Sequence, residues 1–118
     1  MEHDKVNGLF ENRWGMMPED AIDLIKSYFV KYLQHFILID EYNLKSGQWG
    51  VKYEFKVMKI TIKCDRGFLD KWVFFDSNKV SLTDFEPLIV NAKMGSEKNI
   101  RFILDVIKRY VESISADD

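Results

Sequence analysis

The sequence predicts a two-layer α+β protein, in which an antiparallel sheet of about three to four strands carries an N-terminal and a C-terminal helix on one face. Residues 50–75 contain two apolar runs on either side of a tight Asp65-Arg66-Gly67 turn, which is typical of antiparallel strands. Apolar residues recur at helical spacing both before and after this segment. Each helix must bury its apolar stripe, and one face of the sheet can cover both.

The chain has 118 residues and is 47% hydrophobic, which suits one domain with a single core. We expect residues 1–118 to form that domain. Residues 1–17 lack a sustained period and suit a loosely packed N-terminal segment, although Leu9, Phe10, Trp14, Met16 and Met17 could still pack onto the body. The one cysteine excludes an internal disulfide and fits a reducing compartment. Since the N-terminus lacks the features of a secretory signal and no apolar run could span a bilayer, we expect a cytoplasmic protein that does not contact membranes.

The first helix is predicted over about residues 18–36. Pro18 suits the first helical position, and the acids Glu19 and Asp20 favour the positive end of the helix dipole. The apolar stripe consists of Ile22, Ile25, Phe29, Leu33 and Phe36. A strand over residues 37–42 and a loop over residues 43–47 follow, because the loop is rich in turn-forming residues.

The apolar pattern changes phase within residues 49–64. Apolar side chains occupy odd positions up to Val57 and even positions from Met58 onward. A regular strand alternates its side chains strictly, so both sets can share one face only if an extra residue intervenes. We therefore expect one long strand with a β-bulge near Val57-Met58. This correction places the polar residues of the strand together on the opposite face: Lys52, Glu54, Lys56, Lys59, Thr61 and Lys63.

The rest of the chain completes the sheet and the helical layer. Residues 68–75 form the returning strand, and residues 76–79 a loop. Residues 81–93 suit one or two short helical turns, because Pro87 would interrupt a longer helix. The closing helix covers Lys98–Ile114, with Ser96 as its N-cap.

No pattern indicates catalysis, a cofactor or a metal ion. His3 and His35 share no ligand spacing with other residues, and Cys64 falls on the inward face of its strand, where a cysteine behaves as a small hydrophobe. The helices are expected to cover the apolar face of the sheet completely, leaving no hollow for a reaction. The hypothesis of a small enzyme with carboxylates in a cleft is therefore the weakest, and a binding protein without enzymatic activity is favoured.

Charge is distributed unevenly along the chain. The formal net charge is -2 overall, but residues 41–80 hold 8 basic and 5 acidic residues. The lysines at positions 52, 56, 59 and 63 could follow a phosphate backbone, which leaves a nucleic-acid-binding adaptor or regulator as the alternative function. Glu54 interrupts this stripe, and Trp49, Tyr53 and Phe55 fall on the other face, so bases could not stack on them.

The order of elements resembles small bacterial immunity proteins of toxin–immunity systems, such as contact-dependent inhibition and polymorphic toxins. The resemblance rests on the N-terminal helix, the strand pair around Asp65-Arg66-Gly67 and the closing helix. It implies a protein partner, a cognate toxin domain that the chain binds and blocks. The turn triplet has two readings, a hairpin turn or a displayed charged pair.

Acidic residues could mimic phosphate charges if the toxin is a nuclease, and complementary charge would speed association. Trp14, Trp49 and Trp72 are candidate aromatic anchors. The candidate partner-binding residues are Asp40, Glu41, Trp49, Asp65, Arg66, Asp70, Asp76 and Asp84.

Overall fold

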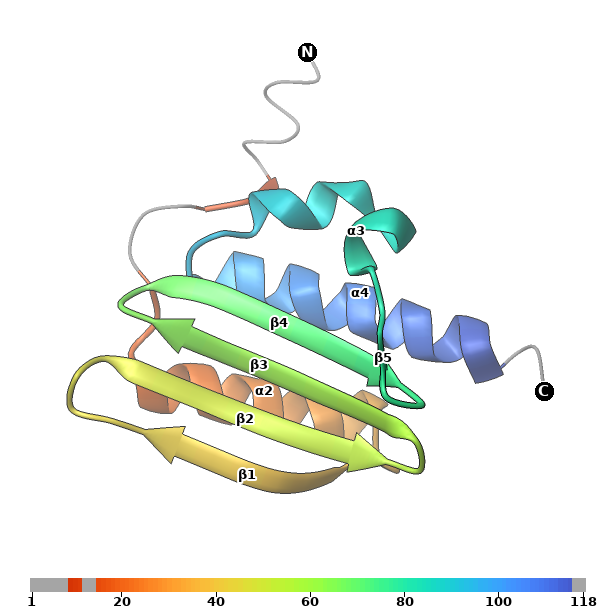
Figure 1. The fold of residues 1–118 in the computed structure, drawn as a ribbon. Coiled ribbons are helices and arrows are strands. Elements are labelled where there is room, and N and C mark those ends of the chain that lie inside the picture. The colour runs from red at the N-terminus through yellow and green to blue at the C-terminus, as the bar shows by residue number, and fades with distance from the viewer. Residues whose placement is uncertain (1–8, 12–14, 116–118) are drawn as a thin grey trace, which may run out of the picture.

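The computed structural model of the protein describes residues 9–11 and 15–115. Its five antiparallel strands lie side by side in chain order: β1 (Ile37–Asn43), β2 (Gln48–Phe55), β3 (Met58–Asp65), β4 (Phe68–Phe75) and β5 (Asn78–Lys79). The long helices α2 (Pro18–Tyr32) and α4 (Glu97–Ser115) cover the same face of the sheet (Figure 1). The predicted α+β class with an antiparallel sheet is confirmed. The sheet has five strands rather than three to four.

The predicted β-bulge at Val57-Met58 is wrong, because the chain makes a hairpin there. β2 ends at Phe55, Lys56 and Val57 form the turn, and Phe55 pairs directly with Met58. A two-residue hairpin places the paired residues on the same face, so it changes the phase of the apolar pattern just as a bulge would. Two further two-residue turns follow at ten-residue intervals, Arg66-Gly67 and Asp76-Ser77.

The first helix ends four residues earlier than its apolar stripe predicts. Leu33 leaves the helical conformation with φ -132°, and the Phe36 N–H donates to the Leu33 carbonyl in the turn that leads to β1. Both side chains are nevertheless buried, and the Phe36 ring packs edge-on against Phe29. Leu33 and Phe36 are therefore buried beyond the end of the helix, at the same three-residue spacing that a further helical turn would give.

The core lies between the inner face of the sheet and the two long helices. Phe29 of α2 stacks on Tyr53 of β2 with ring centroids 3.7 Å apart. Cys64 is buried, as its inward position predicts. The predicted cap of the closing helix is confirmed, since the Asn99 N–H donates to the Ser96 hydroxyl at 3.3 Å. The core residues of the central strands and α4 are Trp49, Val51, Ile60, Ile62, Val73, Ile100, Ile103, Leu104 and Ile107.

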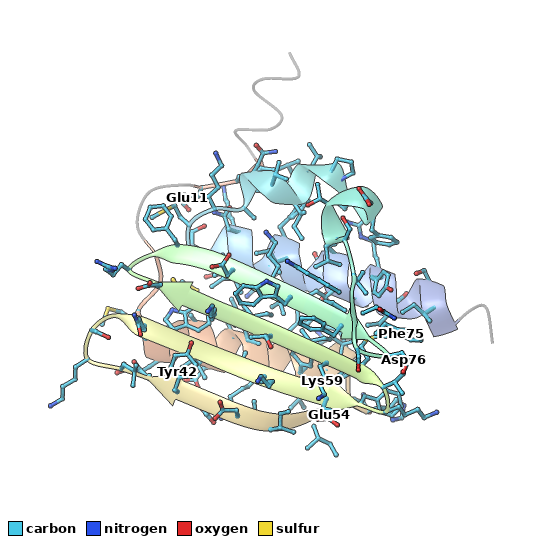
Figure 2. The ribbon with its side chains drawn as sticks, in the orientation of Figure 1. Glu11, Tyr42, Glu54, Lys59, Phe75 and Asp76 are labelled. Atoms are coloured by element: carbon cyan, nitrogen blue, oxygen red, sulfur yellow. The ribbon has the colours of Figure 1, made fainter. Side chains whose placement is uncertain are left out.

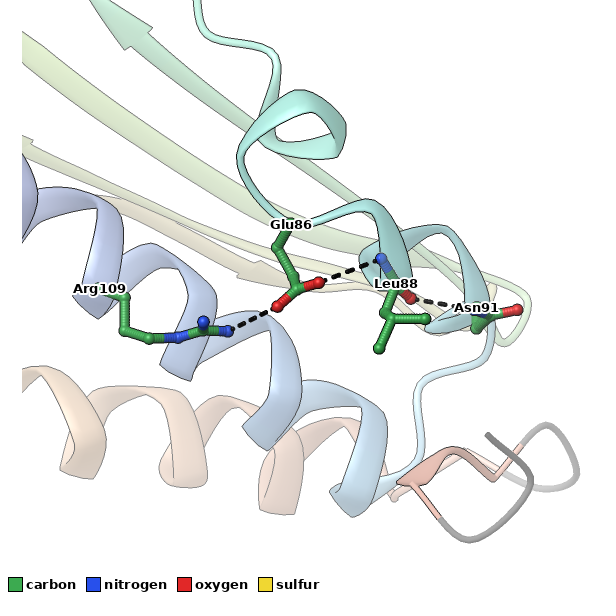
Figure 3. A network of polar contacts seen from close by, with 4 residues as sticks. All are labelled: Glu86, Leu88, Asn91 and Arg109. Carbon is green, nitrogen blue, oxygen red and sulfur yellow. Dashed lines mark hydrogen bonds and ion pairs between the residues drawn. The ribbon is translucent and has the colours of Figure 1, made fainter. Parts of the chain in front are cut away.

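Two short helical segments connect β5 to α4, as the sequence predicts for residues 81–93. They are α3 (Leu82–Phe85) and the 3₁₀ helix η1 (Pro87–Asn91). The Glu86 carboxylate accepts from the Leu88 N–H and pairs with Arg109 of α4 at 3.3 Å (Figure 3). One side chain thus caps η1 and fastens it to the long helix.

The described part of the N-terminal segment packs on the body. Phe10 is buried, and its ring lies edge-on to Phe102 of α4 at 4.7 Å. The Asn99 side chain accepts from the Glu11 N–H and donates to the Glu11 carbonyl. Phe10 thus packs onto the body, which is the alternative that the sequence left open for this segment, while much of residues 1–17 lies outside the described ranges.

A tyrosine joins the two long helices and makes the stability of the fold depend on pH in the alkaline range. The Tyr28 hydroxyl donates to Asp105 Oδ1, and burial, followed by this bond, raises the pKa of Tyr28. Burial, and secondarily Glu41, raises the pKa of Tyr53 to about 12. In the folded state both tyrosines keep their protons above the ordinary tyrosine pKa of 10.0. Their contribution to stability is therefore fully present below that pH and is lost as the pH rises, through about 12 for Tyr53.

Urea unfolding at increasing pH measures this loss. We expect Tyr28→Phe to make the decline above about pH 10 shallower, by up to about 1.4 kcal/mol per pH unit. An unchanged slope in Tyr28→Phe would show that this proton does not govern alkaline stability.

The turn between β3 and β4 requires a left-handed backbone. Gly67 has φ +92°, and a Cβ there would lie 3.1 Å from the Met94 methyl carbon. Gly47 has a similar φ of +89° with open space around it. We expect Gly67→Ala to destabilise the fold by about 1–2 kcal/mol, and slightly more than Gly47→Ala, which lacks the contact. Thermal unfolding of both variants checks this, and a neutral Gly67→Ala would contradict the turn geometry.

Candidate functional site

The face of the sheet that points away from the helices carries the candidate site, and we call it the open face. Strand register assigns its side chains, because directly opposed residues share a face. In Figure 2 the open face is turned to the viewer, with Tyr42, Glu54 and Lys59 on it. Its members are Ile37, Asp40, Tyr42, Gln48, Gly50, Lys52, Glu54, Lys59, Thr61, Lys63, Asp65, Phe68, Asp70, Trp72, Phe74 and Lys79.

Positive and negative charges alternate across the strands of the open face. Lys52, Lys59 and Lys63 lie on this face, as predicted, whereas Lys56 sits in the β2–β3 turn. A carboxylate on a neighbouring strand faces each of the three lysines directly, and such pairs stabilise a sheet. The pairs are Lys52 with Asp40, Lys59 with Glu54, and Lys63 with Asp70. The open face is therefore balanced in charge rather than basic.

Aromatic side chains lie among these charges. The Lys63 ammonium sits over the Trp72 ring, 4.7 Å from its centroid. The Tyr42 ring lies across Gly50, where a Cβ would come within 2.6 Å of it, so glycine lets the ring lie flat on β2. Burial, and then the nearby Asp40 and Asp65 charges, raise the pKa of Tyr42. Tyr42 and Trp72 are thus partly buried and held in place.

The structure brings several of the predicted partner-binding residues to this face. Asp40, Asp65 and Asp70 belong to it, and Asp65 accepts from the Gln48 side-chain amide at 3.3 Å. Arg66 lies in the turn at the end of β3 and pairs with Asp65 at 3.4 Å. Asp76 lines a hollow at the opposite end of the sheet (Figure 2).

Besides Arg66 and Asp76, which lie in turns, three of the predicted residues do not belong to the open face. Trp49 is 2% exposed and packs in the core, so its prediction as an exposed anchor is wrong. Glu41 points to the helical layer, where its carboxylate pairs with Lys26 of α2 at 3.0 Å. Asp84 lies in α3, where its backbone N–H donates to Ser81. Trp14 lies outside the described residues.

Tyr42 and Phe74 were missed as site residues. Tyr42 follows the paired acids at positions 40 and 41, and only the bulge between Leu38 and Asp40 decides which face it takes. Phe74 lies between the apolar residues Val73 and Phe75, so hydrophobicity cannot predict which face of the sheet it takes. A correct strand register would have found both residues.

The described part of the fold has surface hollows, and the expectation that no hollow would serve a reaction stays a prediction. A cavity of about 530 Å³ lies at the β3–β4 turn end, lined mainly by apolar groups that include Trp49, Cys64 and Met94. A more polar hollow of about 460 Å³ lies along β4. Burial raises the pKa of the Cys64 thiol, which disfavours the nucleophilic thiolate.

Within residues 9–11 and 15–115, no group of three or more His, Cys, Asp or Glu side chains could hold a metal ion. His35 stacks on Phe55 with centroids 5.6 Å apart. His3 lies outside the ranges the structure describes. Among the described helices, none is long and apolar enough to span a membrane.

Comparison of the chain with models of protein families, with curated proteins and with solved structures gave no match.

Proposed function

We propose that this chain is a non-enzymatic binding protein that docks a folded protein on its open face. The observation that carries this proposal is the set of aromatic residues placed among alternating charges on a sheet face that neither long helix of the described chain covers. Aromatic anchors surrounded by polar groups are typical of protein interfaces. Phe68 is 61% exposed at one end of the face, and Trp72 lies further along β4 with the Lys63 ammonium over its ring.

The partner we propose is a toxin domain that the chain blocks within the cytoplasm of the producing cell. The resemblance of the helix–sheet–helix order to immunity proteins supports this choice. Asp65 and Asp70 lie at the same end of the open face as Arg66. If the toxin is a nuclease, these carboxylates would occupy the positions of substrate phosphates.

Co-expression with the product of the neighbouring gene tests this proposal. We expect the two proteins to purify together and the chain to restore growth of cells that produce the toxin. Trp72→Ala tests the open face. Val30→Ala on α2 is its matched control, because Val30 is 74% exposed on the helical layer. The toxin assignment fails if no complex forms. If both variants bind equally, the open face is not the interface.

Nucleic-acid binding is the second candidate, favoured by the lysines that share the open face with Tyr42 and Trp72. Aromatic rings on a basic sheet can stack bases. The carboxylates opposite Lys52, Lys59 and Lys63 count against it, because they would repel phosphates. Filter binding at several salt concentrations tests this candidate, because phosphate contacts require the affinity for nucleic acid to fall steeply as the salt concentration rises.

A further inference from the structure

The free edge of β4 contains a polar hollow, which we call the β4 notch. It has a volume of about 460 Å³, and it lies between β4 and the segment that runs from β5 to α3. Figure 1 shows β5 leaving the edge of β4 as the chain rises to α3. The residues that line the notch include Asp70, Lys71, Trp72, Lys79, Ser81 and Thr83.

The outward-facing backbone groups of β4 form hydrogen bonds on either side of the notch but not within it. The Leu69 N–H donates to the Lys93 carbonyl, and the Val80 N–H donates to the Val73 carbonyl, both at 2.8 Å. Leu69 and Val73 therefore direct their backbone groups toward the free edge. Backbone groups of every second residue in a strand point to the same edge, and Lys71 lies two residues from both Leu69 and Val73. Its N–H and carbonyl therefore also face the free edge. Among the residues described, the structure gives these two groups of Lys71 no backbone partner.

The charges of the notch favour an anion. Lys71 and Lys79 contribute two positive charges, and Asp70 contributes one negative charge. The hydroxyls of Ser81 and Thr83 add hydrogen-bond donors. Burial lowers the pKa of Lys71, and the nearby Asp70 offsets this in part. Within the described ranges Lys71 forms no ion pair within 4.0 Å.

We propose that the β4 notch binds a small oxyanion, a carboxylate or a phosphate group, through the unpaired Lys71 N–H and the ammonium groups of Lys71 and Lys79. The notch borders the open face and shares Asp70, Trp72 and Lys79 with it, but its test uses small anions without a protein partner, so its failure and that of the proposed function are distinguishable. An anion here would supply the missing partner of the backbone N–H and balance the two lysines. The indole of Trp72 forms a side wall for the organic part of such a ligand.

Nuclear magnetic resonance titration of the ¹⁵N-labelled chain tests the site. Sodium phosphate and sodium acetate are titrated separately, with sodium chloride at matched ionic strength as the reference. We expect the amide signals of Lys71, Ser81 and Thr83 to shift saturably with phosphate, with acetate or with both. A response to phosphate alone assigns the site to phosphate groups, and a response to acetate assigns it to carboxylates.

Two variants make the test specific. Lys71→Met keeps the aliphatic stem, and Lys79→Gln changes an exposed residue, so folding is preserved in at least one of them. We expect each to weaken anion binding about tenfold, while Lys98→Gln on α4 leaves it unchanged. Shifts that grow linearly and equally with chloride would overturn the proposal. Unchanged affinity in both notch variants would also overturn it.

Discussion

Replacement of Ile60 by alanine is expected to lower the free energy of unfolding by about 2–5 kcal/mol. Ile60 is 0% exposed in the central strand β3, between Tyr53 of β2 and Val73 of β4. Its side chain faces the helical layer, so the substitution leaves a cavity that well-packed neighbours cannot fill. The loss combines the transfer free energy of the removed atoms with the cost of that cavity.

The adjacent Thr61→Ala variant is the matched control. Thr61 lies on the open face, opposite Lys52 and Trp72, so its replacement should change stability by at most about 1 kcal/mol. Urea unfolding of the wild type and both variants gives the comparison. Equal destabilisation by the two substitutions would mean that both faces of β3 are buried, which contradicts a sheet with one uncovered face.

Replacement of Trp72 by alanine is expected to weaken binding of the partner by about 2 kcal/mol or more, which is about thirtyfold in the dissociation constant. Trp72 lies on the open face with the Lys63 ammonium over its ring, so the ring is already oriented before binding. A pre-oriented aromatic ring loses little conformational entropy when it becomes an anchor. Isothermal titration calorimetry with the purified partner measures the change.

Val30→Ala is the control for this prediction, because Val30 is exposed on α2, in the layer opposite to the open face. Its affinity should equal that of the wild type. Circular dichroism of Trp72→Ala must show the wild-type spectrum, so that weaker binding reflects the surface and not unfolding. Loss of affinity in Val30→Ala with retention in Trp72→Ala would assign the interface to the helical layer.

The sequence predicts the elements where hydrophobic spacing is unambiguous. The stripe of the closing helix and the alternation around Asp65-Arg66-Gly67 both predict correct structure, because burial of one face determines them. Lys56-Val57 contains no glycine, asparagine or aspartate, although Lys56 adopts φ +53°. Turn chemistry therefore gave no signal there, and the change of phase was assigned to a bulge.

The candidate site could be predicted only in part, because its composition depends on register across strands. The lysines on one face followed from alternation within β2 and β3. Their opposing carboxylates, Asp40 and Asp70, come from other strands, so their positions depend on the bulge in β1 and on the β3–β4 turn. Trp49 is a different case: alternation within β2 already directs it to the core, and only its size suggested an anchor.

Lysine reactivity in the complex tests most directly whether the open face binds the partner. Reductive methylation of the free and bound chain, followed by mass spectrometry, reports the accessibility of each ammonium group. We expect the complex to protect Lys52, Lys59 and Lys63, while Lys31 and Lys98 of the helical layer react as in the free chain. Protection of Lys31 and Lys98, with full reactivity of the three sheet lysines, would contradict an interface on the open face.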